Sequence, residues 1–292
     1  MFDTAAIQTH AKPLLQSEAF FRALIAAGQN PSRLADGTLV TTRQFAGGLR
    51  LCQIPRADMD TPDLPKLIAD AGLGRHPFLL TPDRPCTHLK RIGAVRLSRS
   101  PQVMEMPLDH GREARLDTIW RRRLAHARSQ DLQIATTNLP MDPGHWIFGD
   151  PRGTSRRHLP ASVLTLAYAA ANPGDAKLFT AYLGQTRIAA VLLLLHEDAA
   201  TWHLTRTTPH GRVRGAEHLL MWTALGWLSD HGTKRLDLGA LTGPAPETTG
   251  FRLGMGAQIR PLGDIWGWWP PLARLRWGRR SRPTTLGVTG AS

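Results

Sequence analysis

"KLFTAYLGQTRIAAVLLLLHEDAATWHLTRTTPHGRVRGAEHLLMWTALGWLSDHGTKRLDLGAL", residues 177–241, is the stretch that decides the fold. It predicts two strands around the turn "GQ", a third strand at "TWHLTRTTP", a helix of roughly four to five turns that ends at Gly232, and a buried fourth strand at "KRLDLGAL". The second strand is apolar throughout and needs cover on both faces. The order strand, strand, strand, helix, strand therefore predicts an α/β fold whose sheet is covered by helices.

A basic loop with two glycines, residues 208–216, joins the third strand to the helix. Free N–H groups at a helix start, together with the helix dipole, favour negative charge there. Glycine lets a pyrophosphate approach the backbone, and Arg212 and Arg214 can add charge-assisted hydrogen bonds. The loop predicts a diphosphate cradle, with an ordinary basic loop as the alternative. It lacks the Gly-Lys-Ser/Thr of a P-loop, and an antiparallel meander precedes it, which argues against a dinucleotide-binding fold.

The first 108 residues predict mixed α and β structure. Residues 14–27 suit an amphipathic helix, 38–56 a β-hairpin across a Gly-Gly turn, and 61–72 a further helix. "HPFLLTPD" and "AVRLSRSPQVMEMPL" are typical of two more strands. Residues 111–138 then predict a helix followed by a strand. The helix has an apolar face made of Leu116, Ile119, Trp120, Leu124 and Ala127. Arg121, Arg122, Arg123 and Arg128 fill the rest, either as a solvated face or as a contact for phosphate or lipid head groups.

We expect four segments along the chain. Residues 1–138 form an N-terminal α+β half, and 139–160 form a loop dense in Pro, Gly and Asp that marks a boundary or a flap. Residues 161–265 form the C-terminal core. Residues 266–292 form a tail rich in Trp and Arg, a composition that suits a membrane interface or a nucleic-acid surface.

The composition is that of a globular protein: 292 residues with 42% hydrophobic and 20% charged side chains. The 36 Lys and Arg residues against 23 Asp and Glu give a net charge of +13, which attracts nucleic acid, an anionic membrane or a phosphate-rich cofactor. Two cysteines make no metal or disulfide framework. The longest apolar run, 188–195, falls short of the roughly 18–20 residues that span a bilayer. We therefore expect a cytoplasmic protein, with peripheral contact to the inner face of the membrane through the Trp/Arg tail.

Residues 177–262 resemble the core of the GNAT superfamily of N-acetyltransferases, and within it the FemAB-related branch, which contains peptidoglycan-bridge aminoacyltransferases. The strands, loop and helix quoted above carry the resemblance. "GFRLGMGAQIRPL" (250–262) resembles that branch's Gly-Phe-Lys-x-x-Phe-Gly-Ala pattern, and "IWRRRLAHARSQDLQI" (119–134) resembles its Trp-Arg helix ahead of a strand. The resemblance implies a GNAT-like fold, with the N-terminal half as a candidate degenerate second copy.

The resemblance also implies an acyl-CoA donor. Its pantetheine would lie along Thr205, Arg206 and Thr207, and its pyrophosphate on Arg212, Val213, Arg214, Gly215 and Ala216. The chain departs from the family pattern at three positions: Glu217 ends the phosphate loop, Arg252 replaces Lys, and Met255 replaces an aromatic residue. These departures leave three choices of donor, namely a CoA thioester, an aminoacyl-tRNA or none.

Attack of an amine on an acyl group requires a base, and Asp237 and Glu247 are the candidates. His196 and Glu197 come next. The alternatives are a structural carboxylate at Asp237 and a solvated one at Glu247. His203 is typical of an ordinary strand residue without a catalytic role. His218 is typical of a residue in the first turn of a helix that contacts solvent. Many GNAT enzymes use a Tyr as the acid, but both tyrosines here, Tyr168 and Tyr182, lie upstream. We find no ligand spacing for a metal.

The function expected is acyl transfer, from acyl-CoA, to an amine or hydroxyl of an unidentified acceptor. One alternative is tRNA-dependent aminoacyl transfer to a cell-envelope precursor. The other is an inactive GNAT-like module that binds an anionic lipid or a protein partner.

Overall fold

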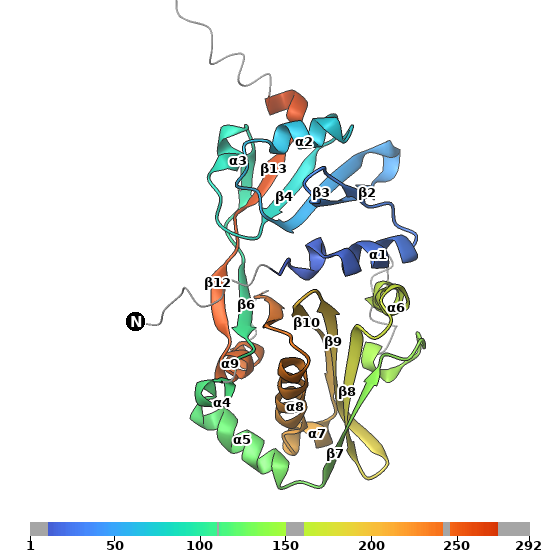
Figure 1. Ribbon diagram of the computed structural model, residues 1–292, viewed down its shortest axis with the longest axis vertical. Helices are drawn as coiled ribbons and strands as arrows, with labels where there is room; N and C mark the ends of the chain where they lie inside the picture. The colour runs from blue at the N-terminus through green and yellow to red at the C-terminus, as the bar shows by residue number, and fades with distance from the viewer. Residues whose placement is uncertain (1–10, 110, 150–160, 242–245, 274–292) are drawn as a thin grey trace, which may run out of the picture. The chain divides into compact units, whose positions relative to one another are not determined.

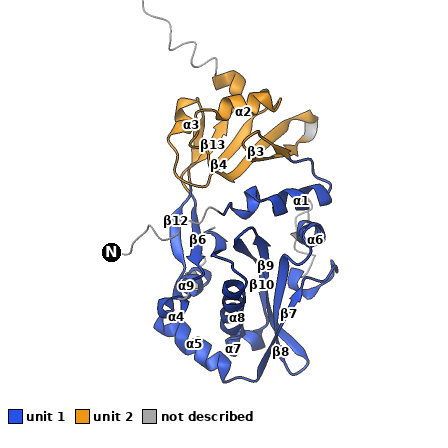
Figure 2. Ribbon diagram, viewed as in Figure 1, with its two compact units in different colours: residues 1–31, 101–262 blue, residues 32–100, 263–292 orange. Residues whose placement is uncertain are grey.

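The computed structural model describes residues 11–109, 111–149, 161–241 and 246–273 (Figure 1). It divides into two compact units (Figure 2). Unit 1 comprises residues 1–31 and 101–262, and unit 2 comprises residues 32–100 and 263–292. Each unit is therefore built from two separate segments of the chain.

Unit 1 contains a seven-stranded mixed sheet in the order β12-β6-β11-β10-β9-β8-β7. Its central pair, β10 and β11, is parallel, and the other neighbours are antiparallel. The strands predicted between residues 177 and 241 are confirmed as β8 to β11. The bounds are β6 (Gln102–Pro107), β7 (Leu132–Asn138), β8 (Ala176–Leu183), β9 (Thr186–His196), β10 (Ala199–Thr207), β11 (Arg235–Ala240) and β12 (Gln258–Pro261).

Helix α8 supplies much of the cover that the apolar strand β9 requires. Gly215, with a φ of 65°, precedes the helix, and Gly232, with a φ of 78°, follows it, so both ends lie where the sequence predicts them. Leu220, Ala224 and Leu228 of α8 share one buried core with Val191 and Leu193 of β9. The helices of unit 1 are α1 (Glu18–Ala26), α4 (Arg112–Arg115), α5 (Thr118–Arg128), α6 (Ala161–Ala171), α7 (Pro209–Val213), α8 (Ala216–Asp230) and α9 (Pro246–Gly254).

Helix α5 begins where the side chain of Asp117 accepts the N–H of Trp120 at 2.6 Å. Leu116, Trp120, Leu124 and Ala127 are buried as predicted. Ile119 is 63% exposed, so its assignment to the apolar face was wrong. One helical step of about 100° separates it from Trp120, and that step carries it off the buried side.

Unit 2 contains a six-stranded mixed sheet in the order β1-β2-β3-β4-β13-β5. The predicted hairpin is confirmed as β2 and β3, and β3 runs parallel to β4. Ile68 and Leu89 from the helices pack with Ile54, Phe78 and Trp268 of the sheet. The bounds are β1 (Ser32–Arg33), β2 (Leu39–Gln44), β3 (Arg50–Ala57), β4 (Phe78–Pro82), β5 (Val95–Ser98), β13 (Ile265–Trp268), α2 (Leu64–Asp70) and α3 (His88–Arg91).

The two units do not follow the boundaries at 138, 160 and 265 expected from the sequence. "AVRLSRSPQVMEMPL" forms two strands in different sheets, β5 in unit 2 and β6 in unit 1. Residues 265–268 form β13 between β4 and β5 instead of starting a tail. Local periodicity shows that a strand exists but not which remote strand it joins, which is why these boundaries differ. Residues 150–160 and 274–292, including most of the expected Trp/Arg tail, lie outside the described residues.

Candidate functional site

Strands β10 and β11 separate after a short parallel contact. Their register covers Ala199–Thr201 against Arg235–Asp237. Beyond it β10 continues to Thr207 and β11 to Ala240 with no further pairing between them. Both strands shift register at this level, β10 between Trp202 and Leu204 and β11 between Asp237 and Gly239. The edge of β10 that faces β11 is thus left without a strand partner, and such an edge can bind an extended ligand. We call this region the strand opening.

Side chains from three elements, β10, α8 and α9, meet at the strand opening. The Arg252 guanidinium of α9 lies 5.3 Å from the ring centroid of Trp202 on β10. The ring of Phe251 lies 5.9 Å from that of Trp202. Glu217, in the first turn of α8, lies 3.5 Å from the hydroxyl of Thr207, measured from Oε2 to Oγ1. The Nε of Arg252 is buried and makes no hydrogen bond with a described residue.

Glu217 and Arg252, the two charged residues that depart from the family pattern, interact electrostatically with each other. Burial lowers the pKa of Arg252, and the charges of Asp237 and Glu217 act in the opposite direction. Burial raises the pKa of Glu217, while its contact with Thr207 and the charges of Arg212 and Arg252 act to lower it. A cluster of perturbed titratable groups next to an opening is typical of a functional site. The sequence pointed to both positions as departures from the family pattern, but not to their contact.

His218 is half-buried, and the expected solvent contact was wrong. Its ring lies 5.0 Å from that of Trp120 and 4.8 Å from that of Phe251. Burial lowers the pKa of His218 to about 4. His203, on β10, contacts the Thr165 hydroxyl at 2.7 Å through Nε2, and burial lowers its pKa to about 4 as well. Both imidazoles are therefore neutral at pH 7.

The three residues expected along the pantetheine make contacts within the protein. The indole N–H of Trp202 donates to the hydroxyl of Thr205. The guanidinium of Arg206 donates to the carbonyl of Trp146 and lies 5.5 Å from its ring centroid. Thr207 contacts Glu217 as described above. All three lie on the part of β10 that continues beyond its pairing with β11.

The expected diphosphate cradle is not an open loop, because residues 209–213 form the short helix α7. The N–H of Gly211 donates to the Thr208 hydroxyl at 3.1 Å and that of Arg212 to the Thr208 carbonyl at 3.0 Å. The N–H groups of Arg214 and Gly215 also donate within the segment. Open amides at these four positions were therefore a wrong expectation. The N–H groups of Ala216 and Glu217 make no hydrogen bond with a described residue.

Position 215 requires glycine for two reasons. Its φ of 65° is left-handed, and a Cβ there would lie 3.2 Å from the carbonyl oxygen of Arg123 on α5. Gly215 and Ala216 are buried, whereas Arg212 and Val213 are exposed and Arg214 is half-buried. The role of these five residues in binding a donor stays a prediction.

Of the two candidate bases, Asp237 lies where β10 and β11 separate. It is 1% exposed, and its Oδ1 accepts the N–H of Gly239 at 2.8 Å. This is the structural contact that we gave as the alternative, and it is compatible with a second role. Glu247 lies in the first turn of α9, and its side chain is outside the described residues.

The secondary candidates lie at the other end of β9 and β10. His196 contacts the Thr201 hydroxyl at 3.0 Å, and Glu197 accepts the N–H of Lys12 at 3.1 Å. The hydroxyl of Tyr168 donates to the carbonyl of Leu195, and burial raises its pKa. Tyr168 is therefore unsuited to act as the acid.

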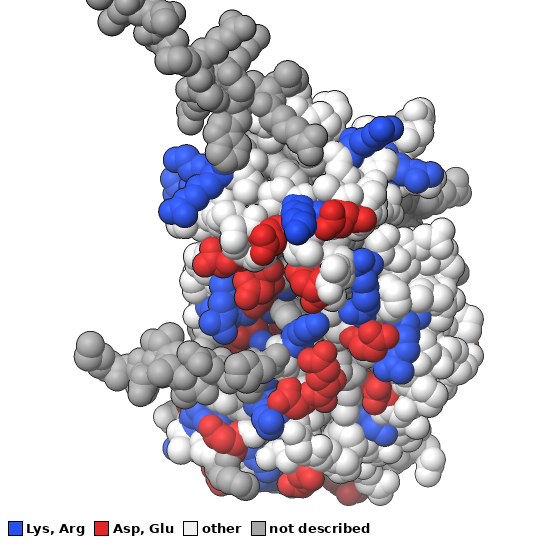
Figure 3. Space-filling view, turned by 45° about the horizontal axis from the view of Figure 1, so that its top comes forward, with Lys and Arg blue, Asp and Glu red and all other residues white. Residues whose placement is uncertain are grey.

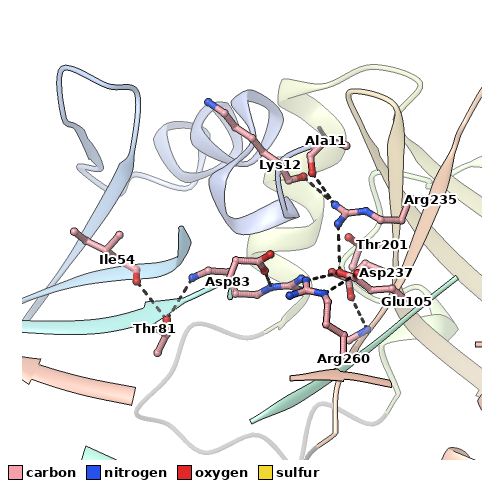
Figure 4. Close-up of polar contacts among 12 residues, drawn as sticks. Ala11, Lys12, Ile54, Thr81, Asp83, Glu105, Thr201, Arg235, Asp237 and Arg260 are labelled. Atoms are coloured by element: carbon pink, nitrogen blue, oxygen red, sulfur yellow. Dashed lines mark hydrogen bonds and ion pairs between the residues drawn. The ribbon is translucent and has the colours of Figure 1, made fainter. Parts of the chain in front are cut away.

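Sequence reasoning missed a buried carboxylate beside the strand opening. Glu105 of β6 is 2% exposed and stands opposite Asp237 in the sheet register. Arg260 binds it through two contacts, at 2.9 and 3.1 Å, and Arg235 through one at 3.3 Å (Figure 4). A buried carboxylate needs such partners, and here they tie β12 and β11 to β6. The feature of the sequence that could have indicated this carboxylate is a single glutamate, Glu105, between Met104 and Met106 in an apolar strand.

An apolar pocket of about 730 Å³ lies in unit 2, lined among others by Leu51, Leu97 and Trp269. No titratable side chain lines it. Among the described residues, no group of three His, Cys, Asp or Glu side chains could hold a metal ion. No helix in the described part of the chain has the length and apolar composition needed to cross a bilayer.

Comparison with known proteins identifies a related domain and a related fold. Residues 110–247 match the family model described as acetyltransferase (GNAT) domain. No curated protein sequence matches the chain. Among solved structures, the crystal structure of FemX superposes with a TM-score of 0.70 at 14% identity, covering 92% of this chain and 95% of FemX.

Two further structures share the fold at a TM-score of 0.55. The C-terminal domain of a putative lysylphosphatidylglycerol synthetase from Agrobacterium fabrum is 15% identical and covers 94% of this chain and 95% of its own. L-PGS from Bacillus licheniformis is 11% identical and covers 88% and 90%. The two mixed sheets suggest a tandem GNAT-like arrangement. Residues 110–247 thus match a GNAT acetyltransferase domain, and the chain has a FemX-like fold, which confirms the resemblance inferred from its sequence.

Proposed function

We propose that the chain is an acyltransferase that moves an acyl group from an activated donor to an amine or hydroxyl at the strand opening. The observation that carries the proposal is the separation of β10 from β11 after Thr201 and Asp237. It leaves a backbone edge along which an extended donor arm can form hydrogen bonds. Trp202, Phe251 and Arg252 stand beside it.

The chemistry needs a donor of hydrogen bonds to the acyl oxygen. The lone pair of the acceptor attacks the acyl carbon and forms a C–N or C–O bond, while negative charge develops on the acyl oxygen. The bond to the donor's oxygen or sulfur then breaks, and that atom takes a proton. Arg252, whose buried Nε–H has no partner among the described residues, is suited to bind the developing negative charge. Asp237 or Glu247 would accept the proton of the attacking group.

The donor that we favour is an aminoacyl ester of tRNA. An acyl-CoA would place its diphosphate on the segment leading into α8, where four N–H groups, those of Gly211, Arg212, Arg214 and Gly215, already donate within the chain. Only the N–H groups of Ala216 and Glu217 make no hydrogen bond with a described residue. The carboxyl of Glu217 also stands in the first turn of α8. An aminoacyl ester does not require a diphosphate at that position. The FemAB-related branch that the sequence resembles contains peptidoglycan-bridge aminoacyltransferases, and FemX shares the fold over nearly the whole chain, which supports the same choice.

The test is transfer of radiolabel from two donors, acetyl-CoA and a mixture of labelled aminoacyl-tRNAs, by the purified chain. Acceptors are a peptidoglycan precursor and phosphatidylglycerol vesicles. We expect transfer from aminoacyl-tRNA that is lost when the donor is treated with RNase. Transfer from acetyl-CoA and not from aminoacyl-tRNA would show that the donor is an acyl-CoA. No transfer from either donor would favour an inactive module that binds its ligand without turnover.

CoA binding gives a second, independent readout. A ligand at a hundredfold excess over its Kd stabilises a protein by about 2.7 kcal/mol. We expect no such stabilisation by CoA. A clear shift that Arg212→Ala and Arg214→Ala abolish would restore the acyl-CoA assignment of these residues.

A further inference from the structure

Helix α5 carries arginines that the proposed function has not used. Arg121, Arg122, Arg123 and Arg128 are exposed. None of the four forms an ion pair with a described residue. The guanidinium of Arg121 donates to the backbone carbonyls of Glu113 and Ala114, which leaves its charge uncompensated.

Two arginines flank an aromatic ring on the neighbouring helix. The guanidinium of Arg112 lies 5.0 Å from the ring centroid of Trp222 on α8, and that of Arg128 lies 5.6 Å from it. Stacking on an aromatic face holds a guanidinium in place while its N–H groups remain available. The basic surface therefore extends from α4 and α5 onto α8.

The same surface reaches the start of α8 and hence the strand opening. His126 of α5 contacts the carbonyl of Val213 at 3.2 Å, and Gly215 packs against Arg123 and Ala127. Arg212 is exposed and Arg214 half-buried just before α8. We call the set the arginine surface: Arg112, Arg121, Arg122, Arg123, Arg128, Arg212 and Arg214.

Little negative charge balances the arginine surface. Residues 112–128 contain six arginines and two carboxylates, Glu113 and Asp117, and Asp117 is engaged in capping α5. On the face drawn in Figure 3, acidic side chains lie among the basic ones. A concentrated, uncompensated positive surface attracts a polyanion.

We propose that the arginine surface binds the phosphodiester backbone of the RNA that carries the donated acyl group, and so directs the acylated end to the strand opening. This rests on the aminoacyl-tRNA donor proposed above. Helix α5 has eleven residues and spans about 16 Å, a length over which a nucleic-acid strand presents several phosphates. Guanidinium groups bind phosphates in pairs of hydrogen bonds. Trp222 is half-buried between two arginines and does not project as an anchor for lipid would.

The test compares two triple variants of the full chain that lose the same charge. Arg121→Gln, Arg122→Gln and Arg123→Gln remove half of the arginines of residues 112–128, and glutamine preserves helix propensity. Arg43→Gln, Arg50→Gln and Arg91→Gln change three exposed arginines of unit 2. The probe is fluorescently labelled, deacylated bulk tRNA, titrated at several salt concentrations.

We expect the first triple to weaken tRNA binding at least tenfold and to reduce the salt slope by about two to three, at roughly 0.9 per phosphate contact. The second triple should change affinity less than twofold. Equal losses in both triples would show nonspecific attraction and overturn the proposal. Loss of binding to phosphatidylglycerol vesicles with tRNA binding intact would make this surface a membrane contact and also overturn it.

Binding of deacylated tRNA does not depend on turnover, so the two proposals fail separately. Binding that depends on the arginine surface without any aminoacyl transfer would contradict the proposed function and leave this surface in place. Aminoacyl transfer that the first triple leaves unchanged would contradict the surface and leave the proposed function in place.

Discussion

Each sheet contains one parallel pair of strands, joined through α2 in unit 2 and through α7 and α8 in unit 1. The two pairs differ in the length over which the strands stay paired. In unit 2, β3 and β4 stay paired from Cys52 with Phe78 to Ala57 with Pro82, the whole length of β4, with one register shift between Pro55 and Ala57. In unit 1, β10 and β11 pair over three positions and then separate. The same arrangement of elements gives a closed pair in one unit and an opening in the other.

The residues at the ends of the pairs account for the difference. Arg56, near the end of β3, and Asp83, directly after β4, form an ion pair at 2.9 Å, and the N–H of Asp83 donates to the carbonyl of Ala57. These contacts hold the closed pair together. In unit 1, Asp237 accepts from Gly239 on its own strand, and Arg252 comes from α9 instead of from either strand. A few side chains thus decide whether a shared framework is structural or offers a site.

The largest effect should come from the core beneath the closed pair. Phe78 is fully buried, with its ring 5.8 Å from that of Trp268. We expect Phe78→Ala to lower the free energy of unfolding by about 3–5 kcal/mol, because it leaves a cavity. Trp202→Ala in the strand opening should cost less, since Trp202 is half-buried. Urea unfolding measures the loss of unfolding free energy in both variants. Equal losses would contradict the view that the closed pair is structural and the strand opening is not.

Arg252→Gln should lower turnover about 100-fold, the effect of removing one donor to a developing negative charge. The matched change in the closed pair, Arg56→Gln, should leave turnover within about twofold and lower the melting temperature, because it breaks the ion pair with Asp83. Steady-state kinetics and thermal unfolding of both variants test this. If the loss of turnover in the two variants is proportional to the fall in their melting temperatures, Arg252 has no specific role in catalysis.

Glu217→Ala should raise the affinity for CoA above that of the natural chain. The change removes a carboxyl on which Arg212 and Arg252 act, next to the unpaired N–H groups at the start of α8. We expect binding at least about tenfold tighter, or about 1.4 kcal/mol, by calorimetry. Asp230→Asn removes a carboxylate at the other end of the same helix and should change nothing. Unchanged binding by Glu217→Ala would mean that the four internally bonded amides already exclude the diphosphate.

The smallest effect should be a dependence of stability on pH. Burial lowers the pKa of His203 and of His218 to about 4, below the ordinary 6.5. Between pH 6.5 and 4 the unfolded chain therefore binds more protons than the folded chain, and stability falls as the pH falls through this window. Replacing both residues with Gln should flatten the melting temperature between pH 6.5 and 4.5. His210→Gln, at an exposed position, should leave the dependence of the melting temperature on pH the same as in the natural chain.

Strong local patterns predicted much of unit 1. The apolar run of β9 and the two glycines that bracket α8 predict their elements correctly because the signal lies within one segment. The partners of β6 and β13 could not be predicted, since both strands join remote segments. For the site, the sequence identified Glu217 and Arg252 as unusual. It could not show that a residue of α8 and a residue of α9 interact, or that α7 would take up the amides of the expected cradle.

The exchange of segments between the units has a consequence for assembly. Strand β13 is synthesised after every strand of unit 1, yet it lies between β4 and β5, which are made much earlier. Until β13 has been synthesised, β4 and β5 each have an unpaired edge. The pairing of β13 with them joins segments far apart in the sequence, and contacts of such high contact order form slowly. A chain shortened to residue 262 would lack the strand that joins β5 to the rest of the unit 2 sheet. Neither unit can therefore be obtained as one continuous piece of the gene.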